Sequence, residues 1–183
     1  MSKLSQTDWI AAGFRALTTT GPQALKAEPL ARTLNTTKGS FYWHFKDVPA
    51  FRDQMLACWE EQATRDIISV LDTLPSPVLK LRTLSQVATA PQEDYGGIGA
   101  EPAIRAWAKG DTQVADAVRR VDAKRLGYLG DIFAEMKLTN PDLPKLFYAG
   151  LIGLQEIADG DDTASAAPLA TLADLMIALS ETD

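Results

Sequence analysis

The side chains best suited to chemistry lie in one short stretch, residues 36–46, which reads TTKGSFYWHFK. Its candidate contact residues are hydroxyl-bearing, aromatic and basic side chains and one glycine: Thr37, Lys38, Gly39, Ser40, Tyr42, Trp43, His44 and Lys46. Hydroxyl, ammonium and imidazole groups can bond base edges and phosphate oxygens, and a glycine lets a backbone come close to a groove. The chemistry that this stretch predicts is recognition of DNA.

The neighbouring elements predict how these side chains are positioned. The run from Leu30 to Leu34 has a short helical pattern, and Asn35 follows where a tight turn needs a positive φ. The next helix is expected to begin at Thr36 or Thr37, either of which can cap it, and to end near His44. A short helix, a tight turn and a second helix form the layout of a DNA-reading helix-turn-helix.

The second of these helices is expected to have an inner and an outer side. Phe41 and Phe45 are four residues apart and share a face, so both should lie in the core. Trp43 has two interpretations, a DNA contact or a packing residue near the surface of a small domain. His44 likewise is either a contact residue or a surface histidine with its hydrogen bonds satisfied.

The distribution of charge agrees with this placement. The whole chain has a net charge of −6, which by itself argues against nucleic-acid binding. Residues 1–52, however, hold seven Lys or Arg against three Asp or Glu, a balance of +4, and the remainder carries −10. A basic amino-terminal module on an acidic body suits a protein that meets DNA at one end, the alternative being a chance cluster on a solvated face.

Catalysis and metal binding find little support. The chain has one His, one Cys, no glycine-rich phosphate loop and no metal-ligand spacing, so we expect no enzyme, cofactor or metal site. The run Asp159–Asp162 lacks the length and terminal Glu of an EF-hand loop and is interpreted as a solvated acidic loop. Cys58 is expected to be a small buried apolar residue.

No segment suggests a membrane or an exported protein. No stretch approaches the roughly 20 apolar residues of a membrane span, and no amino-terminal apolar run precedes a cleavage site. We therefore expect a cytoplasmic protein with no membrane partner.

Apolar spacing predicts an all-α fold of about nine helices, with no convincing strand pattern. The domain break is expected just before a long helix that begins near Val48, which gives domains at residues 1–47 and 48–183. The first expected helix is capped by Thr7 and ended by residues 18–22, the second has Pro29 in its first turn, and the third runs from residue 36 or 37 to 44. The other expected helices lie at 48–71, 78–90, 104–108, 111–136, 143–157 and 166–179. Asp111 is the expected cap of the helix at 111–136, and a loop is expected at 91–99.

The segment from about Asp8 to Leu56 resembles the DNA-binding domain of the TetR/AcrR family of one-component transcriptional regulators. The resemblance rests on the apolar first helix, on Leu30-Ala31 opening the second, and on Lys38-Gly39-Ser40-Phe41-Tyr42-Trp43-His44-Phe45-Lys46 in the third. Two positions depart from the family pattern. Asn35 stands where a turn glycine is usual, and Val48 replaces a lysine whose phosphate contact Lys46 would partly supply.

The resemblance implies that the third helix enters the major groove. Lys38 can then donate to guanine O6 or N7, while Thr37 and Ser40 are suited to base edges. Tyr42 and Lys46 are suited to phosphate oxygens, which fix register without reading sequence.

The resemblance also implies a helical ligand-binding and dimerisation domain. The last two long helices should pair with a second copy as a four-helix bundle, the alternative being that their apolar residues serve the core of a single chain. The expected interface residues are Phe147, Leu151, Leu154, Leu172, Leu175, Met176 and Leu179. The expected effector pocket is lined by polar or aromatic residues near apolar helix faces, each with a core position as its alternative: Trp59, Gln62, Gln86, Trp107, Tyr128 and Gln155.

Together these observations predict a ligand-responsive repressor. A homodimer would bind a pseudo-palindromic double-stranded DNA operator and be released by a small organic effector that shifts the helix near Val48. The alternative is an effector-independent DNA-binding or interaction adaptor, whose carboxy-terminal body only dimerises.

Overall fold

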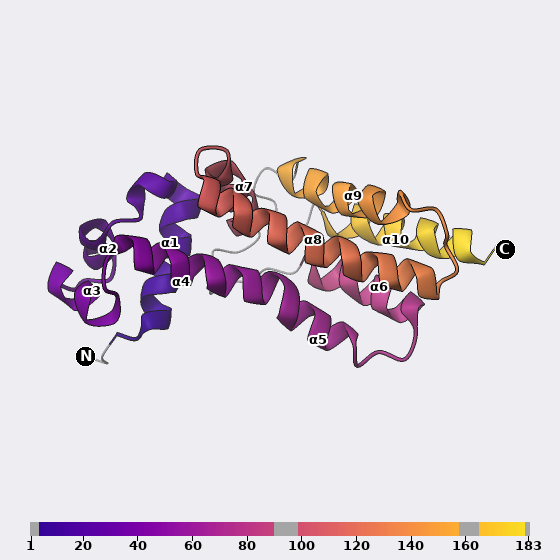
Figure 1. The fold of residues 1–183 in the computed structure, drawn as a ribbon, viewed down its shortest axis with the longest axis horizontal. Helices are drawn as coiled ribbons and strands as arrows, with labels where there is room; N and C mark the ends of the chain where they lie inside the picture. The colour runs from indigo at the N-terminus through magenta and orange to yellow at the C-terminus, as the bar shows by residue number, and fades with distance from the viewer. Residues whose placement is uncertain (1–3, 90–98, 158–164, 182–183) are drawn as a thin grey trace. The chain divides into compact units, whose positions relative to one another are not determined.

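The computed structural model describes residues 4–89, 99–157 and 165–181, and in these ranges it contains helices and no strand (Figure 1). With α4, η2 and α5 counted as one continuous helix, the described residues form nine α-helices and one short 3-10 turn. The expected all-α fold is therefore confirmed. The predicted loop at 91–99, except for Gly99, and the acidic run Asp159–Asp162 lie outside the described residues.

The chain folds into two compact units, each discontinuous in sequence. The first unit comprises Met1–Glu60 and Gln92–Val118, and the second comprises Glu61–Pro91 and Arg119–Asp183. The first unit thus extends beyond residues 1–47, because it also includes most of α4 (Val48–Glu61), all of α7 (Ala100–Ala108) and the start of α8 (Thr112–Glu135). The domain boundary at residue 47 remains a prediction.

Helix α1 spans Gln6–Thr20, and its cap lies two residues before the predicted one. Ser5, not Thr7, is the N-cap: its hydroxyl accepts from the amide of Asp8 at 3.2 Å, and the Asp8 carboxylate accepts from the amide of Ser5 at 2.7 Å. This reciprocal capping box satisfies two backbone donors, which a cap at Thr7 would leave open. The helix ends at Gly21, whose φ of 95° suits a residue without a Cβ.

The remaining helices of the first unit are α2 (Ala27–Thr33), α3 (Lys38–His44), α4 and α7. A short 3-10 turn, η1 (Pro22–Ala24), connects α1 to α2. Helix α7 begins at Ala100, four residues before the predicted start, because Pro102 lies in its first turn, where a missing N–H costs nothing. The cap predicted for α8 is confirmed, since Asp111 accepts from the amides of Gln113 and Val114.

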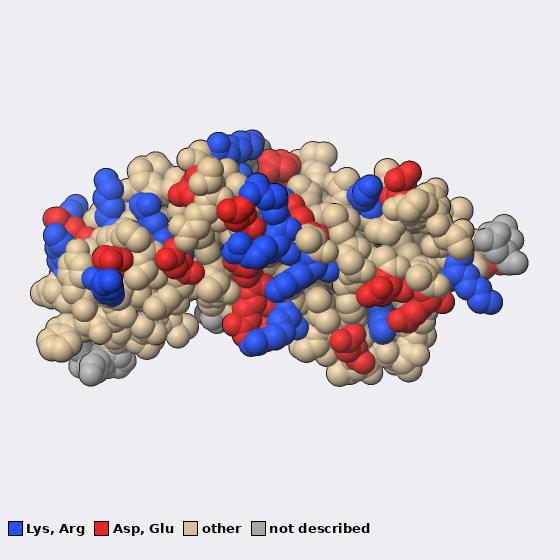
Figure 2. Space-filling model, viewed as in Figure 1, with Lys and Arg blue, Asp and Glu red and all other residues tan. Residues whose placement is uncertain are grey.

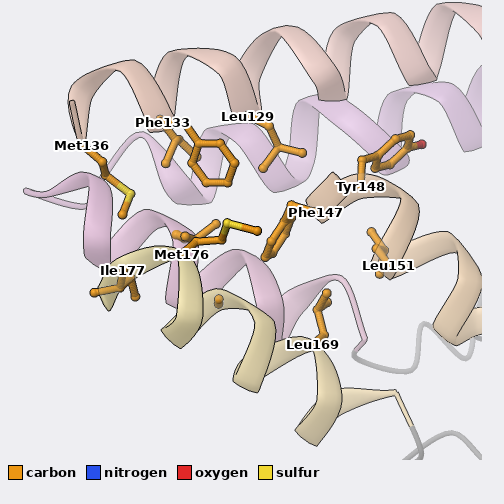
Figure 3. Close-up of a cluster of buried hydrophobic side chains, with 12 residues drawn as sticks. Leu129, Phe133, Met136, Phe147, Tyr148, Leu151, Leu169, Met176 and Ile177 are labelled. Atoms are coloured by element: carbon orange, nitrogen blue, oxygen red, sulfur yellow. The ribbon is translucent and has the colours of Figure 1, made fainter. Parts of the chain in front are cut away.

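The second unit contains η2 (Gln62–Asp66), a π-helical turn, followed by α5 (Ile67–Leu71) and α6 (Pro77–Val87), and then most of α8, α9 (Leu143–Ile157) and α10 (Ala166–Ser180). Its core is an apolar cluster supplied by α6, α8, α9 and α10 (Figure 3). Phe133 of α8 meets Phe147 of α9 edge to face, with ring centroids 6.1 Å apart. Helix α6 ends at Val87 rather than at residue 90.

Two further findings concern expectations from the sequence. Within the described residues, no helix combines the length and apolar character that a membrane crossing requires. Cys58 is half-buried on α4 rather than fully buried.

Candidate nucleic-acid interface

The turn between α2 and α3 is a Schellman motif centred on Asn35. Asn35 has φ 50°, as its place in the sequence predicts. Its amide donates to the carbonyl of Arg32 at 3.2 Å, and the amide of Thr36 donates to the carbonyl of Ala31 at 2.9 Å. These two bonds satisfy the last carbonyls of α2 and reverse the chain within a few residues. The helix-turn-helix geometry thus follows from local hydrogen bonding.

Helix α3 begins at Lys38 because Thr37 caps it. The Thr37 hydroxyl accepts from the amide of Ser40 at 3.3 Å, and the backbone of Thr37 is extended. Of the two caps open in the sequence, the structure selects the second. The helix ends at His44, as expected.

An aromatic cluster fixes the orientation of α3. Phe41 lies fully buried between Trp9 of α1 and Phe51 of α4, with ring centroids 5.4 Å from each. Phe45 packs on Phe51 at 5.0 Å. Such edge-to-face pairs stabilise beyond the area they bury. The predicted core roles of Phe41 and Phe45 are confirmed.

Two side-chain to backbone hydrogen bonds attach the helix-turn-helix to its neighbours. Gln6 of α1 donates to the carbonyl of His44 at 2.8 Å, and Arg52 of α4 donates to the carbonyl of Leu25 at 3.3 Å. The guanidinium of Arg52 also lies 5.8 Å from the ring centre of Trp107 on α7. Both ends of the motif are therefore held by contacts that join residues distant in sequence.

The aromatic cluster leaves a continuous face of α3 exposed, and only the edge of this face touches the cluster, where the Tyr42 ring meets Phe41 edge to face at 5.3 Å. Thr37, Lys38, Gly39, Tyr42, Trp43 and Lys46 are exposed, whereas Ser40 and His44 are half-buried. Trp43 is 87% exposed, so the interpretation of this side chain as a packing residue is wrong. The His44 ring lies 6.4 Å from the Trp9 ring, at the edge of the aromatic cluster. We call the six exposed residues the exposed face of α3.

Gly39 lies on this face with open space around it. A Cβ at this position would meet only the hydroxyl of Thr37, at an ordinary contact distance of 3.7 Å. The fold of the chain therefore does not require a glycine at this position. A requirement for glycine would have to come from a bound partner.

The charges of the candidate interface are dispersed. On the face shown in Figure 2, the lysine and arginine side chains near α2 and α3 lie apart from one another among uncharged and a few acidic side chains. Arg32 is within 3.5 Å of Glu28 on the same helix, and both are exposed. Lys38 and Lys46 provide one positive charge near each end of the exposed face of α3.

The predicted pocket residues are divided between the two units. Trp59 and Trp107 are buried in the first unit. In the second, Gln86 is exposed on α6, Gln62 and Gln155 are half-buried, and Tyr128 donates to the Asp72 carboxylate at 2.7 Å. Burial and this hydrogen bond raise the pKa of Tyr128. Trp107 contacts Arg52 and Tyr128 contacts Asp72, so both side chains contribute to the packing of the folded chain.

The predicted interface residues fall into three groups. Phe147, Leu151 and Met176 are buried in the core of the second unit, so their side chains serve the single chain. Leu154 and Leu172 are half-buried against that core. Leu175 and Leu179 are exposed on α10, and Leu146 and Ile157 are exposed on α9.

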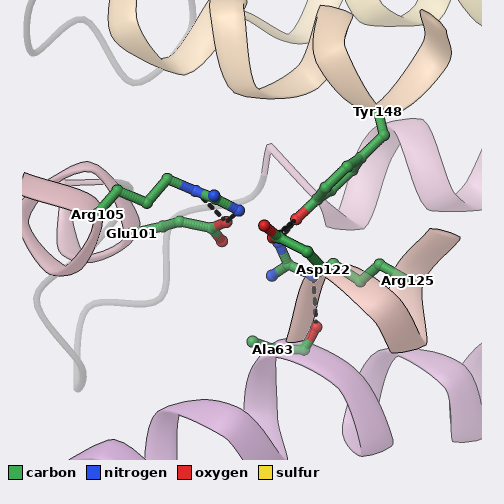
Figure 4. Close-up of polar contacts among 6 residues, drawn as sticks. All are labelled: Ala63, Glu101, Arg105, Asp122, Arg125 and Tyr148. Atoms are coloured by element: carbon green, nitrogen blue, oxygen red, sulfur yellow. Dashed lines mark hydrogen bonds and ion pairs between the residues drawn. The ribbon is translucent and has the colours of Figure 1, made fainter. Parts of the chain in front are cut away.

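The second unit also contains a polar cluster that the sequence did not predict (Figure 4). Tyr148 of α9 donates to Asp122 of α8 at 2.7 Å, and Arg125 donates to the Tyr148 hydroxyl at 3.1 Å. Arg125 also donates, through Nε, to the carbonyl of Ala63 in η2 at 2.9 Å. In the sequence, the only sign of this cluster is a tyrosine within the mainly apolar run of α9. In the first unit, buried Glu101 and half-buried Arg105 of α7 form an ion pair at 2.8 Å (Figure 4).

No protein-family model, no curated protein and no solved structure matches this chain. The function of the protein is therefore inferred from the geometry of the chain and from the resemblance found in its sequence.

Proposed function

We propose that the protein is a DNA-binding transcriptional regulator that inserts α3 into the major groove. The observation that carries the proposal is the exposed face of α3, which presents hydroxyl, lysine and aromatic groups to solvent, with Trp43 87% exposed. The aromatic cluster holds α3 by its opposite side, and Gln6 and Arg52 hold the flanking backbone. A rigid helix that presents polar side chains outward is what base-edge recognition requires.

We further propose that two copies bind together. A single α3 offers too little surface for high affinity, so paired motifs on half-sites about one helical turn apart, or a multiple of it, are expected. Helices α9 and α10 each carry an exposed apolar row, with Leu146, Ala149 and Ile157 on α9 and Leu175 and Leu179 on α10. Exposed apolar rows of this kind are typical of surfaces that pair with another protein.

Release by a small organic effector completes the proposal and follows from the resemblance to TetR/AcrR regulators. The adaptor function is the second candidate. The adaptor is favoured because three of the side chains predicted to line an effector pocket have other surroundings. Trp107 contacts Arg52, Tyr128 is hydrogen-bonded to Asp72, and Gln86 is exposed. A thermal-shift screen with a library of small organic compounds separates the two candidates. A compound that stabilises the protein and releases bound DNA supports the regulator, and a screen without such compounds supports the adaptor.

The test of DNA binding is selection from a random duplex library with the full chain, followed by fluorescence anisotropy on the enriched site at two salt concentrations. We expect an enriched inverted repeat. Lys38→Ala should weaken that site by about 1–3 kcal/mol and relax its sequence preference. Lys46→Ala should weaken all sequences alike and lower the salt slope by about one.

Lys145→Ala is the control, because Lys145 is an exposed lysine on α9, far along the chain from α3. It should leave both the affinity and the salt slope unchanged. If the library shows no enrichment, the proposed function is wrong. If Lys38→Ala loses affinity equally on enriched and random duplex, its role in base reading is wrong.

A further inference from the structure

The long helix that begins at Val48 contains one π-helical turn. Helix α4 runs to Glu61, the π turn η2 covers Gln62–Asp66, and α5 continues to Leu71 without a break. The turn lies where the first unit gives way to the second. π turns inside α-helices are uncommon and occur frequently at functional sites. This turn is therefore the irregular point of a helix that joins the two units.

A π turn has one more residue than the α-helical pattern accommodates. Its hydrogen bonds run from residue i to i+5, so the local carbonyls are displaced from their usual donors and need partners from elsewhere. Arg125 of α8 supplies such a donor, since its Nε lies 2.9 Å from the carbonyl oxygen of Ala63. Ala63 and Thr64 are buried, which raises the cost of leaving a carbonyl there without a partner.

The position of Arg125 is itself determined by a contact between its own helix, α8, and α9. Its NH1 group donates to the Tyr148 hydroxyl of α9, and that hydroxyl donates to Asp122 of α8 (Figure 4). The guanidinium also lies 5.8 Å from the ring centre of Tyr148. The bond to Ala63 therefore depends on the relative positions of α8 and α9 inside the second unit.

We propose that the η2 turn is a one-residue switch that Arg125 holds in its π form. When Arg125 withdraws, the segment becomes regular α-helix, and the residues before the turn rotate by about 100° and shift by about 1.5 Å relative to those after it. The residues before the turn are those of α4, whose Phe51 and Arg52 hold the helix-turn-helix. This inference rests on the proposed function, because it makes the turn the point where changes in the second unit reach the exposed face of α3.

The first test follows the turn directly and needs no DNA. Backbone amide exchange and Cα chemical shifts of residues 61–68 are compared in the wild type, Arg125→Met and Arg65→Met. Arg65 lies in the same turn and is exposed, and its ion pair with Glu61 is at the surface, so its substitution is the matched control. We expect Arg125→Met to slow exchange in this segment at least tenfold and move its shifts to regular α-helical values, and Arg65→Met to leave both unchanged.

Tyr148→Phe keeps the ring and removes only the hydroxyl, so it gives a second measure if Arg125→Met does not fold. It should move the same signals in the same direction by a smaller amount. If both variants fold and show the exchange and shifts of the wild type, Arg125 does not hold the turn and the proposal is overturned.

A deletion tests whether the turn contains a spare residue. Removing exposed Asp66 should be absorbed by conversion of η2 to α-helix, leaving the thermal midpoint within about 5 °C of the wild type. Removing Ser69, an exposed residue of the regular helix α5, should cost much more because no extra residue is available to absorb the loss. Equal losses for the two deletions would overturn the switch.

The link to DNA is measured last, on the enriched duplex. Arg125→Met should convert the turn with its extra residue still present and so rotate α4, and we expect it to change the affinity for that duplex at least tenfold. The Asp66 deletion removes the extra residue and keeps the register of α4 on α5, so it should leave the affinity close to that of the wild type. An unchanged affinity in an Arg125→Met protein whose turn has become α-helical would overturn the regulatory role. If the wild type itself binds no duplex, the proposed function fails, while the exchange measurements still decide whether Arg125 holds the turn.

Discussion

A Cβ placed on Gly13 of α1 would lie 2.6 Å from Cζ of Phe51 on α4. The same atom would lie 2.8 Å from the sulfur of Met55. The two helices therefore approach each other closely at the point where Phe51 meets the aromatic cluster of α3. The absence of a side chain at Gly13 therefore allows α4, whose Phe51 contacts α3, to pack this closely against α1.

Gly13→Ala should destabilise the protein. The added methyl overpacks this contact at a cost of about 1–3 kcal/mol, which exceeds the gain of about 1 kcal/mol from better helix propensity. Urea denaturation measures the difference. Gly127→Ala in α8 is the control and should be neutral or stabilising, because its Cβ would have nothing within 4 Å. A Gly13→Ala protein as stable as Gly127→Ala would contradict the close approach.

Gly39→Ala should separate folding from DNA binding. Its Cβ would make one ordinary contact, so the free energy of unfolding should be unchanged or slightly raised. If the backbone of α3 comes close to base edges, the methyl should reduce affinity for the enriched duplex at least tenfold. Wild-type affinity in the folded variant would show that Gly39 does not come close to DNA.

The capping box of α1 should give stability a dependence on acid. Hydrogen bonds from the backbone amide and hydroxyl of Ser5 hold the pKa of the Asp8 carboxyl below its ordinary value. A carboxyl with a lower pKa in the folded state stabilises at pH values above its unfolded pKa, and this contribution is lost as pH falls through the folded pKa. Asp8→Asn should therefore lower the thermal midpoint at pH 7, and its difference from the wild type should shrink below about pH 4.

The control for this measurement is Glu156→Gln, an exposed carboxyl on α9. Its midpoint should follow that of the wild type at every pH. A constant difference between Asp8→Asn and the wild type from pH 7 to pH 3 would show that the charge of Asp8 contributes nothing to the cap.

Substitution on the apolar row of α10 should separate the two copies without unfolding either one. Leu175 is 58% exposed, so Leu175→Glu removes little of the core of the single chain. We expect a monomer in sedimentation equilibrium and at least a tenfold loss of affinity for the inverted repeat. Leu79→Glu, on an exposed position of α6, should leave the dimer intact. A Leu175→Glu dimer would place the interface elsewhere.

Local hydrogen bonding and helical periodicity explain what the sequence predicted well. Asn35 and Thr37 act on backbone groups within a few residues, and Phe41 and Phe45 share a face because of helical spacing. The start of α1 was misplaced because Ser5 and Thr7 are both good caps, and only the carboxylate of Asp8 decides between them. Competition between nearby caps is not resolved by residue type alone.

Contacts between distant residues explain what was missed. The π turn has no local signature in the run from Gln62 to Asp66, and the contact of Arg125 with Ala63 joins positions 62 residues apart. The burial of Phe147 rather than Leu146 likewise depends on which side of α9 faces α8 and α10. Apolar residues on both sides of α9 make its sequence ambiguous, and tertiary packing decides the outcome.

The discontinuous first unit has a consequence for how the protein is made. Helix α1 packs against α7, whose buried Ile104 and Trp107 complete the unit. During synthesis the helix-turn-helix emerges early, but the helix that covers α1 is translated only after residue 100. Domains generally fold as units as they leave the ribosome. The amino-terminal helices should therefore reach their final stability late in translation, and a nascent chain arrested before α7 should be sensitive to protease.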